Sequence, residues 1–317
     1  MRFVRFFTCV AAVLLLATGA EAAVKVAKKS ISQKTKAYEL AITYPVTGNA
    51  AIDAVIGKFA KDKLAEYKSD SDDDHQADES AYDFELGYTV ERNDDKMFVV
   101  LFNESTYTGG AHPNSFAYSF NFLMPDGAQV FLPEIVDGQR GIARISDYAI
   151  KDLTRQWADE GADGGDNEWL KRGAGPLASN FDIFVMKPNA IVITFPSYQV
   201  TSYAAGPQEV TVPLSALKGL IRKDWRAPQA SFDCAKAKSA IEKTICGNAM
   251  LARMDRQAGE KYAENLANAY EPTDRDKWRT SQRAWVAVRD KACGGGDAGC
   301  LKASYAARMK ALQAFTP

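Results

Sequence analysis

The residues with the clearest chemistry are the cysteines Cys234, Cys246, Cys293 and Cys300, which all lie in the carboxy-terminal segment 231–315. Cysteine thiolates either bind metals such as zinc or pair as disulfides, and zinc sites usually contain Cys-x-x-Cys pairs. That spacing does not occur here, the number of these cysteines is even, and the first residues of the chain indicate export. We therefore expect two disulfides.

Three connectivities are possible for these cysteines, and we favour pairing between neighbours in the sequence. Cys293 and Cys300 flank the glycine-rich run 294–299, which can bring two helix ends together. Cys234 and Cys246 would lie about 18 Å apart on one continuous helix. Their pairing therefore requires the chain near Cys234 to fold back over a short helix that begins around Ala237.

His112 is the candidate for acid–base catalysis, because His75 is the only other histidine of the chain. A triad with a distant serine and a carboxylate would make it the base of a hydrolase. The chain contains neither a Gly-x-Ser-x-Gly turn nor a His-Glu-x-x-His helix. Gly109 and Gly110 precede His112, and Pro113 follows it, which favours a tight turn or a binding loop over catalysis.

Asp255 and Arg289 are the charged residues that the helical patterns point inward. Asp255 follows Leu251 by four residues, and Arg289 follows Trp285 by four. A cross-helix ion pair is the simpler interpretation, and a ligand-binding guanidinium is the alternative. The aromatic side chains nearby are interpreted as core residues rather than as a platform for sugars.

An acidic run covers residues 69–80 and contains Asp70, Asp72, Asp73, Asp74, Asp78 and Glu79. Its aspartates suggest a calcium loop, but the glycine and the distant glutamate of that motif are missing. We therefore interpret the run as a solvated polar loop, and we expect no metal or cofactor anywhere in the chain.

The amino-terminal residues indicate a cleavable signal peptide. Arg2 and Arg5 precede an apolar run from Val10 to Ala17, and small residues at positions 20 and 22 fit signal peptidase. The run is shorter than the roughly 20 residues that cross a bilayer. We predict cleavage after Ala22 and a periplasmic or secreted protein, with an uncleaved anchor as the alternative.

The remaining chain divides by charge and by pattern. Residues 23–228 balance to −7, whereas residues 229–317 contain 15 Lys/Arg against 10 Asp/Glu, a balance of +5. Alternation predicts strands over 38–44, 82–90, 96–105, 116–122, 181–185, 190–195 and 209–212. Helical spacing predicts helices over 50–67, 142–157 and 214–221. This is the pattern of an α+β domain with an antiparallel sheet.

Beyond residue 230 the apolar residues recur at helical spacing only. Leu251 and Tyr262, Trp278 and Trp285, and Leu301 and Tyr305 mark separate helical faces. Such a small all-α domain is marginal without its disulfides. The predicted organisation is a signal peptide (1–22), an acidic α+β domain (23–223), a linker (224–230) and a helical domain (231–317).

Two sets of motifs resemble known families. The first is similar to the LprI-type lysozyme-inhibitor module; it consists of Ser231-Phe-Asp-Cys234, Glu242, Cys246, Asp255, Gln282-Arg283-x-Trp285, Arg289, Cys293, Cys300 and Tyr305. The second resembles the extracellular domain of RsiV-type anti-sigma factors and of some peptidoglycan deacetylases; it consists of Tyr107-Thr108-Gly109-Gly110-Ala-His112-Pro-Asn114 and Phe195-Pro-Ser-Tyr198 through Tyr203 to Gly206. The RsiV resemblance implies lysozyme binding.

We therefore expect a non-catalytic binding protein of the bacterial envelope whose partner is lysozyme or another muramidase. The acidic domain would be steered toward a basic partner. The partner-binding candidates are Asp70, Asp72, Asp73, Asp74, Thr108, Gly109, Gly110, His112, Asn114, Tyr198 and Tyr203. One alternative is a peptidoglycan-binding adaptor that holds wall fragments on Trp278, Tyr198 and Tyr203. The other is a cell-wall hydrolase centred on His112.

Overall fold

A computed structural model describes residues 23–74, 81–159, 167–223, 225–226, 229–269 and 271–314 of the chain, without the side chains of residues 70–74 and 167. The predicted signal peptide and the second half of the acidic run lie outside the described residues. The α+β region comprises residues 23–223 and the helical module comprises residues 231–314; both names are used in this sense.

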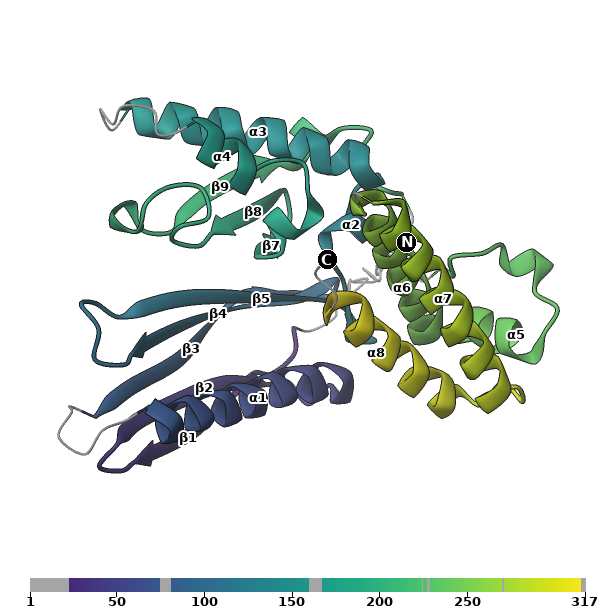
Figure 1. Cartoon of the computed structure of the whole chain (residues 1–317), viewed down its shortest axis with the longest axis horizontal. Helices are drawn as coiled ribbons and strands as arrows, with labels where there is room; N and C mark the ends of the chain where they lie inside the picture. The colour runs from purple at the N-terminus through teal and green to yellow at the C-terminus, as the bar shows by residue number, and fades with distance from the viewer. Residues whose placement is uncertain are drawn as a thin grey trace, which may run out of the picture.

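The first half of the α+β region is a sheet in the order β1 (Ala27–Lys34), β2 (Tyr38–Val46), β3 (Tyr82–Asn93), β4 (Met97–Tyr107), β5 (Asn114–Leu123) and β6 (Ala128–Gln129). The predicted antiparallel pairing is confirmed except between β2 and β3, which run parallel. Helix α1 (Ala50–Asp74) causes this exception, because it crosses from the end of β2 to the start of β3. The sheet is therefore mixed (Figure 1).

Helix α1 and the sheet share a hydrophobic core. The alternating residues of β2 turn Leu40 and Ile42 inward, where they meet Ile52 and Ile56 of α1. The helix extends through Asp74, so the first half of the predicted acidic loop is helical, and that prediction is wrong there. Extending an existing helix adds one hydrogen bond for each residue that it orders, and this gain overrides the low helix propensity of aspartate.

A second, antiparallel sheet contains β7 (Phe184–Met186), β8 (Ala190–Phe195) and β9 (Gln208–Pro213). Helices α3 (Gly138–Asp159) and α4 (Asn167–Gly173) cover it, and the short helix α2 (Leu132–Ile135) leads into α3 (Figure 1). Residues 178–181, 203–205 and 214–217 form single 3₁₀ turns. Trp225, which falls in the predicted linker, is buried in the core of this second unit.

Side chains of β5 join the two sheets. The amide of Asn121 donates to the carbonyl of Phe184 at 2.8 Å and accepts from the main-chain N–H of Met186 at 2.9 Å. The hydroxyl of Ser119 accepts from the N–H of Phe184 at 2.9 Å. Asn121 is only 1% exposed, so its amide satisfies backbone groups of β7 that no neighbouring strand reaches on that side.

The helical module contains α5 (Ala240–Gly247), α6 (Ala249–Asn268), α7 (Pro272–Ala292) and α8 (Ala298–Ala314), as the sequence predicted. Ser239 and Glu242 form a capping box at the start of α5, and the Asn248 side chain caps α6. Leu251, Leu301 and Tyr305 are fully buried between the helices. Among the helices that the structure describes, none combines the length and the apolarity of a membrane span.

The disulfides pair neighbouring cysteines, as favoured from the sequence: Cys234 with Cys246, and Cys293 with Cys300. Residues before α5 fold back over that helix, which brings Cys234 to its end. The loop closed by the second bridge docks on α5 through Gly296, whose carbonyl accepts from the Thr244 hydroxyl at 2.9 Å. Gly296 has a φ of 77°, and a Cβ there would lie 2.6 Å from that hydroxyl oxygen, so this position requires glycine.

A buried charge cluster joins the helical module to the α+β region. Glu134 of α2 is 3% exposed and lies 3.5 Å from the guanidinium of Arg253 on α6. The Glu134 carboxylate also accepts from the amide of Gln257 at 3.1 Å and from the N–H of Phe131 at 2.9 Å. Burial raises the pKa of Glu134 above its ordinary value, although these donors oppose the shift.

We predict that reduction loosens the helical module and leaves both sheets intact. The bridges close loops of 12 and 7 residues, so each contributes about 2–3 kcal/mol by loop-closure entropy. Hydrogen exchange of the full-length protein, with and without a reductant, measures the effect. Exchange should accelerate in α5–α8 alone. Equal acceleration in the sheets would contradict this assignment.

We also predict an asymmetry between the partners of the buried ion pair. Nε and Nη2 of Arg253 are buried without a hydrogen-bond partner, whereas Glu134 keeps two other donors. Glu134→Ala should therefore cost about 3–5 kcal/mol by leaving the Arg253 charge buried and unpaired. Arg253→Met should cost less. Urea unfolding of both variants and of the double variant provides the comparison; equal losses would refute the asymmetry.

Candidate functional site

Two segments that are far apart in the sequence meet at the end of the first sheet and form what we call the loop site, residues 108–114 and 196–206. The ring of His112 stacks on Tyr203 with centroids 3.8 Å apart, and Tyr203 in turn lies 5.5 Å from Tyr198. The Tyr203 hydroxyl donates to the carbonyl of Pro113 at 2.7 Å. The structure thus brings together the two motifs that the sequence singled out separately.

Tyr198 is the prominent side chain of the loop site. It is 58% exposed, and its φ of 71° lies in the left-handed region, the only such value among the non-glycine residues that the structure describes. That conformation costs a tyrosine of the order of 1–3 kcal/mol and persists only where the surroundings enforce it. Tyr198 is therefore a candidate for binding, because an exposed ring gains little from packing that could offset this strain.

The neighbours of Tyr198 hold it in this conformation. The Trp169 indole donates to the Tyr198 carbonyl at 2.9 Å. The amide of Gln199 donates to the carbonyls of Gly173 and Asn180 at 2.8 and 2.9 Å, and Val200 is buried. The loop is therefore fixed to α4 and to the 3₁₀ turn at 178–181, and Tyr198 projects from a rigid base. Sequence reasoning missed Trp169, which lies outside both motifs.

His112 does not occupy the environment of a hydrolase triad. Its ring is held by the Tyr203 stack, and its Nδ1 lies 3.1 Å from the carbonyl oxygen of Pro113, to which an Nδ1–H donates. A stacked tyrosine and a peptide carbonyl are not the serine and carboxylate of such a triad. Gly109, with a φ of 83°, makes the tight turn that aims His112 at Tyr203.

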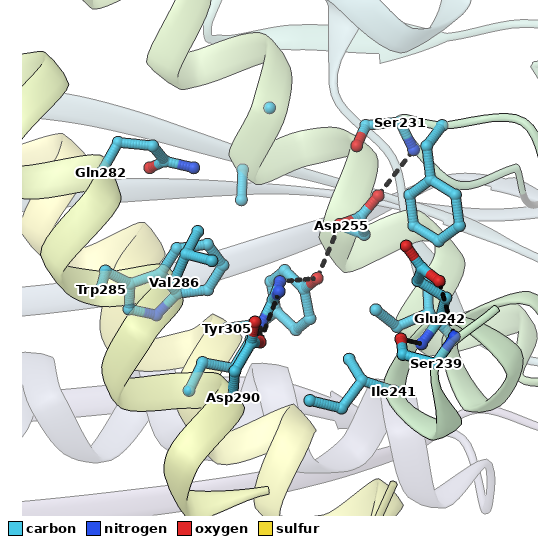
Figure 2. A pocket seen from close by; sticks show the side chains of 15 residues that line it. Ser231, Ser239, Ile241, Glu242, Asp255, Gln282, Trp285, Val286, Asp290 and Tyr305 are labelled. Atoms are coloured by element: carbon cyan, nitrogen blue, oxygen red, sulfur yellow. Dashed lines mark hydrogen bonds and ion pairs between the residues drawn. The ribbon is translucent and has the colours of Figure 1, made fainter. Parts of the chain in front are cut away.

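A second candidate site is a pocket of about 270 Å³ in the helical module, which we call the module pocket (Figure 2). Glu242 of α5 lies on one side, Trp285 and Val286 of α7 lie on the other, and Phe232 and Ile241 also belong to the lining. Many of the residues that carry the LprI-type resemblance line this pocket: Ser231, Phe232, Glu242, Asp255, Gln282, Trp285, Arg289 and Tyr305. Arg283 of the same set is exposed and is not part of the lining.

The floor of the module pocket is a chain of hydrogen bonds centred on Tyr305. Its hydroxyl donates to Asp255 at 2.6 Å and accepts from Arg289 at 2.9 Å. The other Asp255 oxygen accepts from the N–H of Ser231 at 2.6 Å. The predicted direct ion pair between Asp255 and Arg289 is therefore wrong, because the Tyr305 hydroxyl stands between them (Figure 2). Arg289 instead pairs directly with Asp290 at 2.8 Å.

Local electrostatics fix the charge states in the module pocket. Burial, together with the neighbouring Asp255, raises the pKa of Tyr305 above its usual value, so the phenol stays protonated and keeps donating. The backbone N–H groups of Ser239 and Lys238 lower the pKa of Glu242, because they donate to its carboxylate at the start of α5. Glu242 is therefore an anion at neutral pH.

Gln282 reveals a residue that sequence reasoning missed. Its side-chain oxygen accepts from Nε and Nη2 of Arg308 at 3.0 and 2.7 Å. Arg308 is 4% exposed, and its guanidinium lies 5.7 Å from the ring centroid of Trp285. Arg308 and Gln282 together support the Trp285 wall of the pocket. A buried arginine on the apolar face of the last helix was the available signal.

The other sequence candidates lie elsewhere. Asp70, Asp72, Asp73 and Asp74 fall in the last turns of α1, and their side chains are outside the described residues. Trp278 is 5% exposed and belongs to the helical core, as expected, so it cannot be the sugar platform of the adaptor hypothesis. Within the described ranges, no group of three metal-ligating side chains comes together.

Three family models match successive parts of the chain. Residues 31–115 match the family described as deacetylase PdaC, and residues 134–215 match DUF3298, a family of unknown function. Residues 234–312 match the family described as lysozyme inhibitor LprI. The LprI resemblance is confirmed. The first match spans α1 and the strands from β1 to β4, and the second spans the second sheet with its helices, so two models divide most of the α+β region between them.

One individual protein also matches the chain over most of its length. The chain is 25% identical over 209 residues to the peptidoglycan-N-acetylmuramic acid deacetylase PdaC of Bacillus subtilis (strain 168). The match covers 65% of this chain but 43% of that protein, so the chain spans less than half the length of this relative.

Two solved structures of DUF3298 family proteins also match. The one from Pseudomonas aeruginosa PAO1 has 12% identity and a TM-score of 0.48, and the match covers 63% of this chain and 96% of that one. The one from Bacteroides fragilis NCTC 9343 has 17% identity and a TM-score of 0.43, and the match covers 63% of this chain and 95% of that one.

The hydrogen-bond chain in the module pocket gives a stability prediction. Tyr305→Phe removes one donor from the buried Asp255 carboxylate and one acceptor from Arg289, and it should cost about 1–3 kcal/mol. Tyr262→Phe, at a half-buried tyrosine of the same core, is the matched control and should cost less than 1 kcal/mol. Urea unfolding measures both. Equal stability of the two variants would show that the chain does not stabilise the module.

Proposed function

We propose that this protein is an exported binding protein of the bacterial envelope that inhibits a lysozyme-type muramidase, with Tyr198 entering the substrate cleft of that enzyme. The observation that carries the proposal is the exposed Tyr198 at a φ of 71° above the His112–Tyr203 stack. The proposal is non-catalytic: the protein acts by occupying a cleft, and no residue of the loop site is assigned a chemical step.

The geometry of Tyr198 is suited to inhibition. Tyrosine offers a large contact area with few rotatable bonds, which makes it a frequent anchor of protein interfaces. Its main chain is already fixed by Trp169 and Gln199, so binding does not have to order the loop. Such preorganisation reduces the entropy that association loses. Aromatic side chains that stack on sugar rings in a glycan-binding cleft can also stack on the ring of a tyrosine.

Charge and compartment support the same proposal. Residues 23–228 balance to −7, which would attract a basic muramidase over a range of about one Debye length. The two disulfides suit an oxidising compartment such as the periplasm or the exterior of the cell. The family description of residues 234–312 names lysozyme inhibition, and the name of the PdaC relative places that protein in wall chemistry.

A second candidate function is a peptidoglycan-binding adaptor. The aromatic group of the exposed Tyr198 and His112 and the half-buried Tyr203 favours it, since a glycan strand could stack on the exposed rings directly. The two functions differ in the partner that the aromatic rings contact: an inhibitor contacts the muramidase, whereas an adaptor contacts the peptidoglycan. Sedimentation with purified cell walls in the absence of muramidase distinguishes them, because the adaptor pellets with the walls and the inhibitor stays in solution.

The test of inhibition is a turbidity assay with muramidase, bacterial cell walls and the full-length protein. Wild type should slow clearing, and Tyr198→Gly should weaken binding about 30-fold or more, the effect of losing an anchor worth at least about 2 kcal/mol. Glycine keeps the left-handed backbone without strain, so the variant removes the side chain alone. Its unfolding free energy should not fall below that of wild type.

Val288→Ala is the control variant, because Val288 is a 66% exposed apolar residue of α7 in the helical module, outside the loop site. It should inhibit as wild type does. Undiminished inhibition by Tyr198→Gly would remove Tyr198 from the mechanism. Product release from walls without muramidase, abolished by His112→Ala, would overturn the non-catalytic proposal.

A further inference from the structure

The module pocket is separate from the loop site. The β4–β5 hairpin, whose turn carries His112, points to the left end of the molecule in Figure 1, whereas α5 lies at the right end. The residues that line the pocket all belong to the helical module, from Ser231 to Tyr305. A partner that covers the loop site therefore leaves the pocket open to a second partner.

The charges of the pocket favour a cation. Its lining contains three carboxylates, Glu242, Asp255 and Asp290, against one guanidinium, Arg289. Arg289 is paired with Asp290, and Asp255 is held by the neutral donors Tyr305 and Ser231. Glu242 faces the pocket, and its carboxylate accepts from the backbone N–H groups of Lys238 and Ser239. Three carboxylates against one guanidinium give the lining a negative balance, which would repel an entering anion and attract an entering cation.

The walls favour an organic cation on an apolar stem. Glu242 lies opposite Trp285 and Val286, and Ile241 and Phe232 also line the pocket, so aliphatic carbons can pack between apolar side chains while a charged tip reaches Glu242. No three metal-ligating side chains gather anywhere in the described chain, which argues against a metal ion here. A volume of about 270 Å³ fits one long side chain rather than a glycan strand.

We propose that the module pocket binds a lysine or arginine side chain presented by a basic protein, with the cationic group paired to Glu242 and the stem between Phe232 and Trp285. The module as a whole has a net charge of +5, which does not attract a basic partner. Any attraction must therefore come from the carboxylates of the pocket itself. The identity of that partner rests on the proposed function: it is a second molecule of the muramidase, bound at the opposite end from the first.

The chemistry of the pocket can be tested without any muramidase. The probes are the N-acetyl methylamides of lysine, arginine and norleucine, and the signal is the indole N–H resonance of Trp285, assigned with Trp285→Phe. The lysine and arginine probes should shift this resonance saturably, and the uncharged norleucine probe should not. Shifts that are equal for all three probes would overturn recognition of a cation.

Two variants assign the recognition to Glu242. Glu242→Gln keeps the side-chain acceptor of the capping box, so α5 should remain folded, and it should weaken probe binding at least 10-fold. Glu271→Gln, at the start of α7 where the side chain makes no capping bond, is the matched control and should bind as wild type does. Unchanged affinity in Glu242→Gln would overturn the proposed pairing.

Calorimetric stoichiometry with the muramidase tests the partner. Wild type should bind two molecules, Tyr198→Gly should keep only the pocket site, and Tyr198→Gly combined with Glu242→Gln should bind none. A stoichiometry of one that Tyr198→Gly abolishes would overturn the second muramidase. The absence of any muramidase binding by wild type would overturn the proposed function and the partner together, whereas the probe titration would still decide the chemistry of the pocket.

Discussion

The buried carboxylate of Asp255 is the constraint on which the helical module depends. A carboxyl group that is only 8% exposed requires hydrogen-bond partners, and Asp255 has two from distant parts of the module: the N–H of Ser231 and the hydroxyl of Tyr305. Ser231 lies close in the sequence to Cys234, which the disulfide to Cys246 attaches to α5. The Tyr305 hydroxyl accepts a hydrogen bond from Arg289 of α7. One charge thereby sets the positions of α5, α6, α7 and α8 around the pocket.

The same requirement, that buried polar groups find partners, holds the larger parts of the molecule together. Asn121 completes the hydrogen bonds of β7 and so attaches the second sheet to the first. Glu134 attaches α2 to α6 through Arg253 and Gln257. Each contact is specific because its loss would leave a buried group unsatisfied, a penalty of about 1–3 kcal/mol that apolar packing alone would not impose.

The two candidate sites are preorganised in different ways. The loop site holds an exposed Tyr198 in a strained conformation by hydrogen bonds to its own carbonyl and from the side chain of Gln199. The module pocket holds ordinary conformations in place by hydrogen bonds among Asp255, Tyr305 and Arg289. A projecting ring suits insertion into the cleft of a partner, whereas a hollow lined by the Glu242 carboxylate suits reception of a side chain. The molecule therefore has one surface that can insert into a partner and one that can receive a side chain.

The sequence by itself determined the features that depend on neighbours along the chain. The alternation of β2, the capping box at Glu242 and the pairing of Cys293 with Cys300 all follow from short spacings. Only the tertiary structure decided that β2 and β3 run parallel, that Tyr305 separates Asp255 from Arg289, and that His112 stacks on Tyr203. These contacts join residues 16 to 91 positions apart, and the packing of whole elements, which no local pattern encodes, sets their geometry.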